Sequence, residues 1–220
     1  MAEKAQSNGQ RGTASRRERE KAQRRDDILR AAKTVFFTRG FHAATVDDVA
    51  VEAEVGKGTV YLYFDTKETI LAHLLLDGLD ALVENLAVAF AAAEQLDAGT
   101  RLRRLAAAYL KFFQDSPEYY RMIMAFDRGQ FQASVDAATY QEVYVRSLHG
   151  LEWLERAVKQ AQAEGVITIA NTREAASVLW AGLNGVLVLL SHPLRVDIVA
   201  TDLEPLYSMM TEVLISGSRK

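Results

Sequence analysis

The sequence predicts an all-α fold in which a small N-terminal helical domain precedes a larger helical one. Three observations lead to this prediction. Apolar residues recur at helical spacing through most of the chain, no segment alternates with period two, and residues 44–64 contain two short helical patterns around a tight turn. With 220 residues, 49% of them hydrophobic and 25% charged, the composition is that of an ordinary globular chain.

Positive charge is concentrated at the N-terminus. Residues 1–25 hold eight Lys or Arg against three Glu, whereas residues 71–220 hold 13 Lys or Arg against 18 Asp or Glu. Residues 1–15 show no apolar periodicity, so we expect a disordered basic tail there. We expect residues 16–25, including Arg24 and Arg25, to lie near DNA, because a basic arm can follow phosphates or enter a minor groove. The alternative is a solvated tail.

The first helices are predicted from spacing and end signals. Apolar residues between Ile28 and Phe36 recur at helical spacing, and Gly40 suits the position just past a helix C-terminus. Thr45 is a candidate N-cap for the second helix, whose acids Asp47 and Asp48 suit the positive end of the helix dipole. A turn at residues 54–56 then leads into the third helix.

The third helix has an outward face that is polar, aromatic and cationic. Val60 and Phe64 can be buried, and the remaining side chains are Lys57, Thr59, Tyr61 and Tyr63. Such a face suits phosphate and base-edge contacts in a major groove. The alternative is that the aromatic residues belong to a small core and that Lys57 is solvated. We favour a core position for Phe64 alone.

These residues resemble the DNA-binding domain of the tetracycline-repressor (TetR) family. The match covers about residues 24 to 75, and the run from Lys57 to Glu68, Lys-Gly-Thr-x-Tyr-x-Tyr-Phe-x-x-Lys-Glu, is its most specific part. The resemblance implies that DNA is contacted by Thr45, Lys57, Gly58, Thr59, Tyr61, Tyr63 and Lys67. Among these, Thr45 and Lys67 would bind phosphates on either side of the recognition helix.

Two positions depart from the family pattern. Asp47 stands where many members have Arg, which removes a possible base or phosphate contact and puts an anion near DNA. Glu54 stands where many members have a turn glycine, which suggests a turn residue that is either not left-handed or slightly strained. We therefore expect base contacts to depend mainly on the third helix.

The helical pattern continues from Lys67 to about Ala93 without a linker, so movement in the larger domain can be transmitted to the first. Pro117 suits a first helical turn, Gly165 a C-terminal cap and Thr172 an N-cap. Further helices are predicted at residues 99–114, 117–127, 134–164, 172–192 and 203–216. We expect three regions: a tail at 1–15, a helix-turn-helix domain at 16–70, and an effector-binding and dimerisation domain at 71–220.

Residues 175–190 are apolar around most of the helix circumference, yet they are too few to cross a bilayer comfortably. We expect this helix and the last one to form an isologous four-helix interface between two copies, as the resemblance also implies. The predicted interface residues are Leu179, Leu183, Val186, Leu187, Leu190, Leu206, Met210 and Val213. Two copies would meet a palindromic operator in successive major grooves.

The resemblance further implies a pocket for a small effector in the second domain. Large side chains there predict an apolar, aromatic pocket with occasional polar groups, although core packing is the alternative for each of them. The candidates are Tyr109, Phe112, Met122, Phe126, Tyr140, Tyr144, His149, Trp153, Trp180 and Asn184.

Other kinds of site lack support in the sequence. The chain has no cysteine and its four histidines are scattered, so we expect no disulfide, metal site or cofactor. No phosphate-binding loop, nucleophile elbow or carboxylate pair occurs, so we do not expect an enzyme. The polar N-terminus lacks a secretory signal, and we expect a cytoplasmic protein with no membrane partner.

The sequence therefore predicts a homodimeric transcriptional regulator, namely a repressor that a small, largely apolar effector releases from a palindromic operator. The alternative is a DNA-bound helical scaffold whose second domain recruits a protein partner and binds no small molecule.

Overall fold

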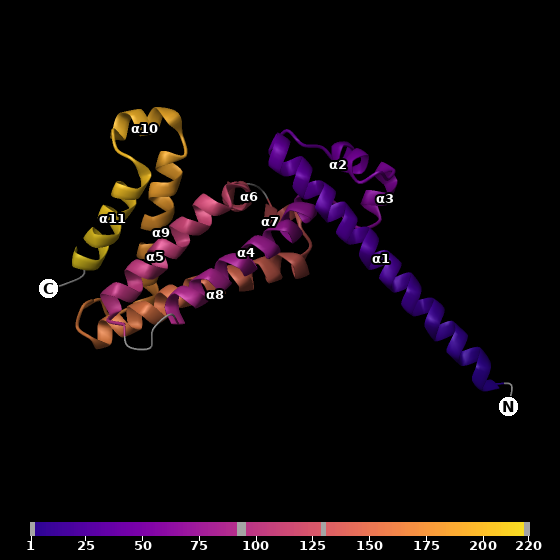
Figure 1. Cartoon of the computed structure of the whole chain (residues 1–220), viewed down its shortest axis with the longest axis horizontal. Helices are drawn as coiled ribbons and strands as arrows, with labels where there is room; N and C mark the ends of the chain where they lie inside the picture. Colours follow the sequence, from indigo (N-terminus) through magenta and orange to yellow (C-terminus); the bar gives the residue numbers. More distant parts are fainter. Residues whose placement is uncertain (1–2, 92–95, 129–130, 218–220) are drawn as a thin grey trace. The chain divides into compact units, whose positions relative to one another are not determined.

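The computed structural model describes residues 3–91, 96–128 and 131–217 (Figure 1). The predicted all-α class is confirmed, since this part of the chain contains helices and no strand. The helices are α1 (Glu3–Arg39), α2 (Val46–Glu52), α3 (Lys57–Tyr61), α4 (Lys67–Ala91), α5 (Ala98–Asp115), α6 (Pro117–Arg128), α7 (Phe131–Ser134), α8 (Ala137–Ala163), α9 (Thr172–Leu190), α10 (Pro193–Val199) and α11 (Leu203–Gly217).

Helix α1 begins at Glu3, so residues 3–15 are helical where we expected a disordered tail. That expectation was based on the absence of apolar periodicity, which indicates that a segment has no core to pack against. It does not exclude a helix, because helical hydrogen bonds form within the segment and need no core. The packed part of α1 starts further along the chain, where Ile28 is fully buried.

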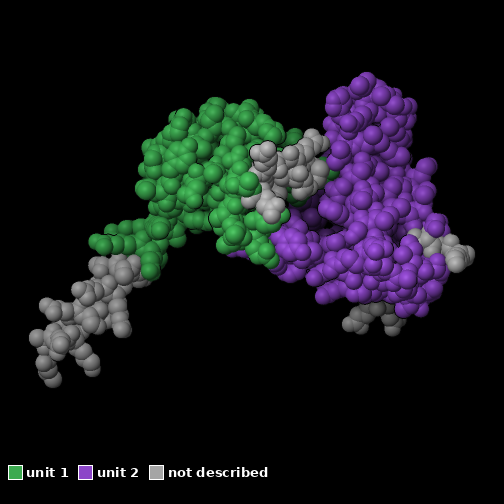
Figure 2. Space-filling model, turned by 180° about the vertical axis from the view of Figure 1, so that it is seen from behind, with its two compact units in different colours: residues 1–76, 120–141 green, residues 77–119, 142–220 purple. Residues whose placement is uncertain are grey.

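The chain divides into two compact units, coloured separately in Figure 2. Unit 1 comprises residues 1–76 and 120–141, and unit 2 comprises residues 77–119 and 142–220. The division falls inside α4, α6 and α8. It differs from the boundary at residue 70 that we expected, because a pattern of local periodicity cannot show that residues 120–141 pack with the N-terminal helices.

Unit 1 has a small apolar core beneath the two short helices. Val49 of α2, Val60 of α3 and Phe64 after α3 are 1% exposed or less, and α2 packs against both α1 and α3. The predicted end signals of these helices are confirmed. Gly40 follows α1 with a φ of +78°, which favours glycine, and Thr45 is the N-cap of α2.

Unit 2 is organised around the close approach of α9 and α11. Helix α11 packs against α9 and α5, and Figure 1 shows α9 and α11 joined through the short helix α10. A Cβ atom added to Gly182 of α9 would lie 2.8 Å from Cδ1 of Leu214, so the end of that leucine side chain would have to shift. Helix α9 is also bonded to α5, because the Tyr109 hydroxyl donates a 2.9 Å hydrogen bond to Oδ1 of Asn184.

Helix ends in the second half were predicted to within a few residues. Pro117 begins α6, and Gly165 follows α8 with a φ of +70°. The N-cap of α9 is Asn171 and not Thr172, because the Asn171 side chain accepts hydrogen bonds from two first-turn amides. Helices α7 and α10, of four and seven residues, were not predicted.

Gly78→Ala should destabilise the protein. An alanine Cβ at this α4 position would lie 2.5 Å from Cδ1 of Tyr119, so the ring must move. We expect the free energy of unfolding, measured in urea, to fall by about 1–3 kcal/mol. Gly150→Ala is the matched control, because its added Cβ would lie 4.0 Å from Leu86. That variant should gain about 0.5–1 kcal/mol from helix propensity. A Gly78→Ala protein as stable as the parent would contradict the packing described.

Candidate nucleic-acid interface

The turn between α2 and α3 is tight and strained. Glu54 has a φ of +54°, in the left-handed region that costs a residue with a Cβ about 1–2 kcal/mol. The next residue, Val55, donates its N–H to the carbonyl of Ala50 at 2.9 Å, which closes the turn. Of the two possibilities left open by the sequence, a left-handed and strained Glu54 is the one that the structure has.

Among the side chains predicted to contact DNA, those of Lys57 and Tyr61 are exposed on α3. Tyr61 is 45% exposed, whereas Val60 and Phe64 are buried, as expected for Phe64. Thr59 and Tyr63 are partly buried. The core alternative is therefore excluded for Tyr61 within this chain. The ammonium of Lys57, the hydroxyl of Thr59 and the phenol of Tyr61 thus lie along a short helix whose Val60 is buried in the core of unit 1.

Lys57, the first residue of α3, forms an ion pair with Asp47 of α2. The ammonium Nζ lies 2.9 Å from Oδ2 of Asp47, and the two side chains are 52% and 62% exposed. This hydrogen bond and the negative charge of Asp47 raise the pKa of Lys57 above its ordinary value. From the sequence, we expected Asp47 only to put an anion near DNA. The sequence feature that could have indicated this ion pair is an acid in the first turn of α2 together with a lysine at the start of α3.

Thr45 and Asp48 form a capping box at the start of α2. The Thr45 hydroxyl accepts a hydrogen bond from the Asp48 N–H and donates one to Oδ2 of Asp48 at 2.7 Å. The Thr45 N–H donates to the same oxygen, and Arg39 reaches the other at 2.5 Å. The Thr45 bonds, followed by Arg39, lower the pKa of Asp48. A phosphate contact by the Thr45 hydroxyl, predicted from the sequence, would compete with this cap.

Lys67, the first residue of α4, is held by the backbone between α1 and α2. Its ammonium donates 2.9 Å hydrogen bonds to the carbonyls of Phe41 and Ala44 and lies 4.4 Å above the Phe41 ring. An ammonium has three hydrogens, so one remains for the phosphate contact predicted from the sequence. The preceding residue, Thr66, donates its hydroxyl to the carbonyl of Ser134 at 2.8 Å. The first turn of α4 is thus bonded to two other segments of unit 1.

The arginines of α1 have different surroundings. The Arg25 guanidinium lies 5.3 Å above the ring of Phe64 and so covers the core beneath α3. Arg24 lines an open polar groove beside the α2–α3 turn, together with Arg30, Thr34 and Glu54. Further toward the N-terminus, Arg16 is exposed and pairs with Glu20. Positive charge therefore continues along α1, but part of it is balanced by acids on the same helix.

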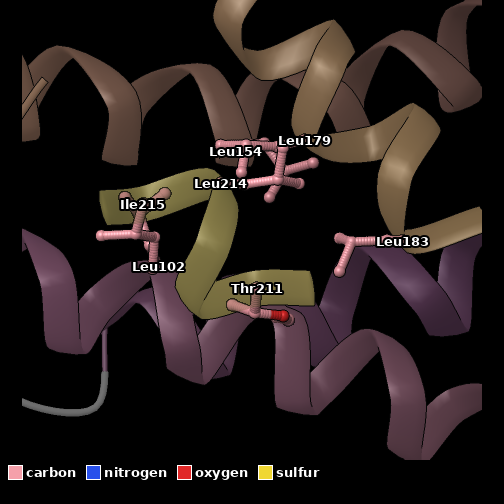
Figure 3. A pocket seen from close by; sticks show the side chains of 8 residues that line it. Leu102, Leu154, Leu179, Leu183, Thr211, Leu214 and Ile215 are labelled. Carbon is pink, nitrogen blue, oxygen red and sulfur yellow. The ribbon is translucent and has the colours of Figure 1, made fainter. Parts of the chain in front are cut away.

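Unit 2 contains an apolar cavity with room for about one water-sized sphere, about 10 Å³. Figure 3 shows Leu154, Leu179 and Leu214 converging on it, with the Thr211 hydroxyl as a polar group nearby. Its lining consists of Leu102, Ala106, Leu154, Leu179, Leu183, Thr211, Leu214 and Ile215. None of the predicted effector-pocket residues is among them.

The predicted pocket residues do not form one cluster. Met122, Phe126 and Tyr140 belong to unit 1 and the others to unit 2. Three of them, Tyr109, Phe112 and Met122, are buried; Tyr140, Trp153 and Asn184 are partly buried; and Tyr144, His149 and Trp180 are exposed. The side chain of Phe126 lies outside the described residues. Periodicity identified large side chains but not the direction in which each one points.

The predicted dimer-interface residues also fall on two faces. Leu179, Leu183, Val186 and Leu187 are buried within one protomer. Leu190, Leu206 and Met210 are partly buried, and Val213 is exposed. The exposed apolar side chains of α9 and α11 are Val178, Trp180, Met209 and Val213. Helix α9 is apolar nearly all round, so its sequence did not distinguish the face that packs inside the protomer from the face left open.

No group of three or more His, Asp or Glu side chains with metal-binding geometry occurs in the part of the chain that the structure describes. The polar chemistry of unit 1 is instead that of donors, hydroxyls and aromatic edges around α3, which can bind the acceptor-rich surface of a nucleic acid.

Residues 28–74 match the family model described as bacterial regulatory proteins, tetR family. The chain is 34% identical over 120 residues to the HTH-type transcriptional activator FasR of Mycolicibacterium smegmatis, covering 53% of this chain and 54% of FasR. It is 42% identical over 59 residues to the HTH-type transcriptional repressor KstR2 of the same organism, covering 27% of this chain and 29% of KstR2. The chain thus spans about half, or less, of the length of these curated relatives.

The fold is similar to that of the transcriptional regulator FadR from Bacillus subtilis, whose structure was solved in complex with stearoyl-CoA. The TM-score is 0.66 with 21% sequence identity, over 87% of this chain and 97% of FadR. At this identity the likeness shows the fold alone, and it extends the similarity from the N-terminal domain to the larger helical domain.

Lys67→Met should destabilise unit 1 while keeping the apolar stem of the side chain. Two charge-assisted hydrogen bonds would be lost, and the carbonyls of Phe41 and Ala44 would lose their ammonium donor. We expect the free energy of unfolding in urea to fall by about 1.5–3 kcal/mol. Lys21→Met, at an exposed position of α1, is the control and should change it by less than about 0.5 kcal/mol. Equal stabilities of the two variants would show that the Lys67 bonds contribute nothing.

Asp48→Asn should weaken the dependence of stability on acid pH. The folded pKa of Asp48 lies below its ordinary value of 3.8, so the ionised carboxylate stabilises the fold above that pH. This contribution is lost as the pH falls through the folded pKa. Urea unfolding from pH 3 to pH 7 should therefore show a smaller acid decline for the variant than for the parent, and a lower stability at pH 7. Asp26→Asn is the control. If the stability of Asp48→Asn depends on pH in the same way as that of Asp26→Asn, the capping box does not contribute as described.

Proposed function

We propose that this chain, whose residues 28–74 match the model of the tetR family of bacterial regulatory proteins, is a cytoplasmic transcriptional regulator that binds a palindromic operator as a homodimer. The observation that carries the proposal is the exposed face of α3, where Lys57 and Tyr61 project from a helix whose inner face is buried. Side chains of this kind on a helix-turn-helix bind base edges and phosphates in the major groove.

A second copy of the chain is the proposed partner of α9 and α11. Helix α9 is long and apolar enough to cross a membrane by length and composition alone, and only a third of its apolar window is buried in the protomer. Helices α9 and α11 expose large apolar side chains, Val178 and Trp180 on α9 and Met209 and Val213 on α11, which supports burial of these helices against a protein surface. A two-fold axis that pairs α9 and α11 with the same helices of a second copy would form a four-helix interface.

The proposed effector is a small, largely apolar molecule that binds in the larger helical domain. The leucine-lined cavity of unit 2 supports this class, although at about 10 Å³ it must open to admit a ligand. FadR, which is similar in fold, was solved with stearoyl-CoA, so long-chain acyl compounds are the first to test by thermal shift. Relatives include an activator and a repressor. We propose a repressor that the effector releases from DNA.

Tyr61→Ala should weaken operator binding and leave the oligomeric state unchanged. The operator would first be selected from a random pool of duplexes with the unaltered protein, and affinity would be measured by fluorescence anisotropy at fixed salt. We expect about a tenfold loss, since one good base contact is worth about 1–3 kcal/mol. Val51→Ala, an exposed apolar position on α2, is the control and should bind like the parent.

Two results would overturn the proposal. The unaltered protein could fail to enrich any sequence from the pool. Alternatively, Tyr61→Ala could bind the enriched sequence as tightly as Val51→Ala does.

A further inference from the structure

The two acids in the first turn of α2 have different partners. Asp48 accepts both Thr45 bonds and the Arg39 contact, and its side chain is 23% exposed. Asp47 takes no part in the capping box, is 62% exposed, and has Lys57 at 2.9 Å. An acid in the first turn of a helix gains a little from the helix dipole, but that gain does not require a partner on the next helix.

The Asp47–Lys57 pair presents a hydrogen-bond acceptor beside a hydrogen-bond donor. The ammonium has three hydrogens and the carboxylate several lone pairs, so each keeps free capacity after binding the other. A phosphate group offers acceptors only, and its negative charge repels the carboxylate. The major-groove edge of a base pair offers an acceptor next to a donor, as in N7 and N6 of adenine or O6 of guanine beside N4 of cytosine.

We propose that Asp47 is a specificity-determining residue: together with Lys57 it forms a unit that binds the acceptor and donor of a base pair and disfavours phosphate. This inference rests on the proposed DNA-binding function. Without Asp47, Lys57 would be an untethered cation at the start of α3, and such a cation binds any phosphate within reach. With Asp47, the carboxylate fixes the orientation of the Lys57 ammonium. It also offsets the positive charge of Lys57, which weakens the attraction to phosphates of DNA that lacks the matching base pair.

Asp47→Asn tests the proposal because it removes the charge and keeps the size of the side chain. The capping box is on Asp48, so the variant should fold. Glu52→Gln is the matched control, since it makes the same change in net charge at an exposed position in the last turn of α2. Lys57→Gln removes the other partner of the pair. Each protein would be used for selection from the same random pool, and for binding to the selected operator and to a scrambled duplex.

Three results are expected. Asp47→Asn should bind the scrambled duplex several-fold more tightly, with a salt dependence steeper by up to about 0.9 in the slope of log K against log salt. Its ratio of operator to scrambled affinity should fall at least about fivefold, the lower limit for one bidentate base contact. In the selection, Asp47→Asn and Lys57→Gln should lose preference at the same base pair of each half-site.

Other outcomes would overturn the proposal. If Asp47→Asn and Glu52→Gln change both affinities equally, the effect is one of net charge. If Asp47→Asn selects the same sequences with the same preference at every position, or if the two pair variants lose preference at different positions, Asp47 and Lys57 are not a unit. Failure of the unaltered protein to select any sequence would instead contradict the proposed function.

Discussion

The arrangement of the proposed DNA-binding helices depends on how one ammonium group is held. Lys67 begins α4, and its hydrogen bonds to the carbonyls of Phe41 and Ala44 bind the first turn of that helix to the segment between α1 and α2. The position of α2, and through it of α3, follows from that segment, because α2 begins directly after it. A lysine is suited to this contact, since it can bond two carbonyls and still pack its charge over an aromatic ring.

The two acidic residues in the first turn of α2 have different roles. Asp48 is used internally, for the cap and for Arg39, whereas Asp47 faces outward with Lys57. The exposed surface of α3 is therefore less cationic than its sequence suggests. If a protein with a net charge of −3 binds DNA as proposed, it must gain its affinity from a small surface, and neutralising a lysine lowers affinity for DNA in general. We propose that the Asp47–Lys57 pair lowers the general affinity for DNA and in return discriminates between base pairs.

Features that depend on neighbouring residues could be predicted from the sequence, and features that depend on distant ones could not. Gly40, Pro117 and the Thr45 cap act within a few residues, so local pattern was sufficient to place them. The Asp47–Lys57 pair requires the geometry of a turn with a left-handed Glu54. Likewise, the bond from Thr66 to Ser134 joins positions 68 residues apart. For α9, an apolar pattern all round the helix left the direction of each side chain open.

The most direct test of this account is a crystal structure of the protein bound to a duplex that it has selected. We expect Lys67 to keep both carbonyl bonds in the complex, with at most its third hydrogen on a phosphate, and α3 to lie in the major groove with Tyr61 and Lys57 at base edges. A complex in which the Lys67 ammonium has left Phe41 and Ala44 for the DNA backbone, with α2 and α3 still in place, would contradict the central claim.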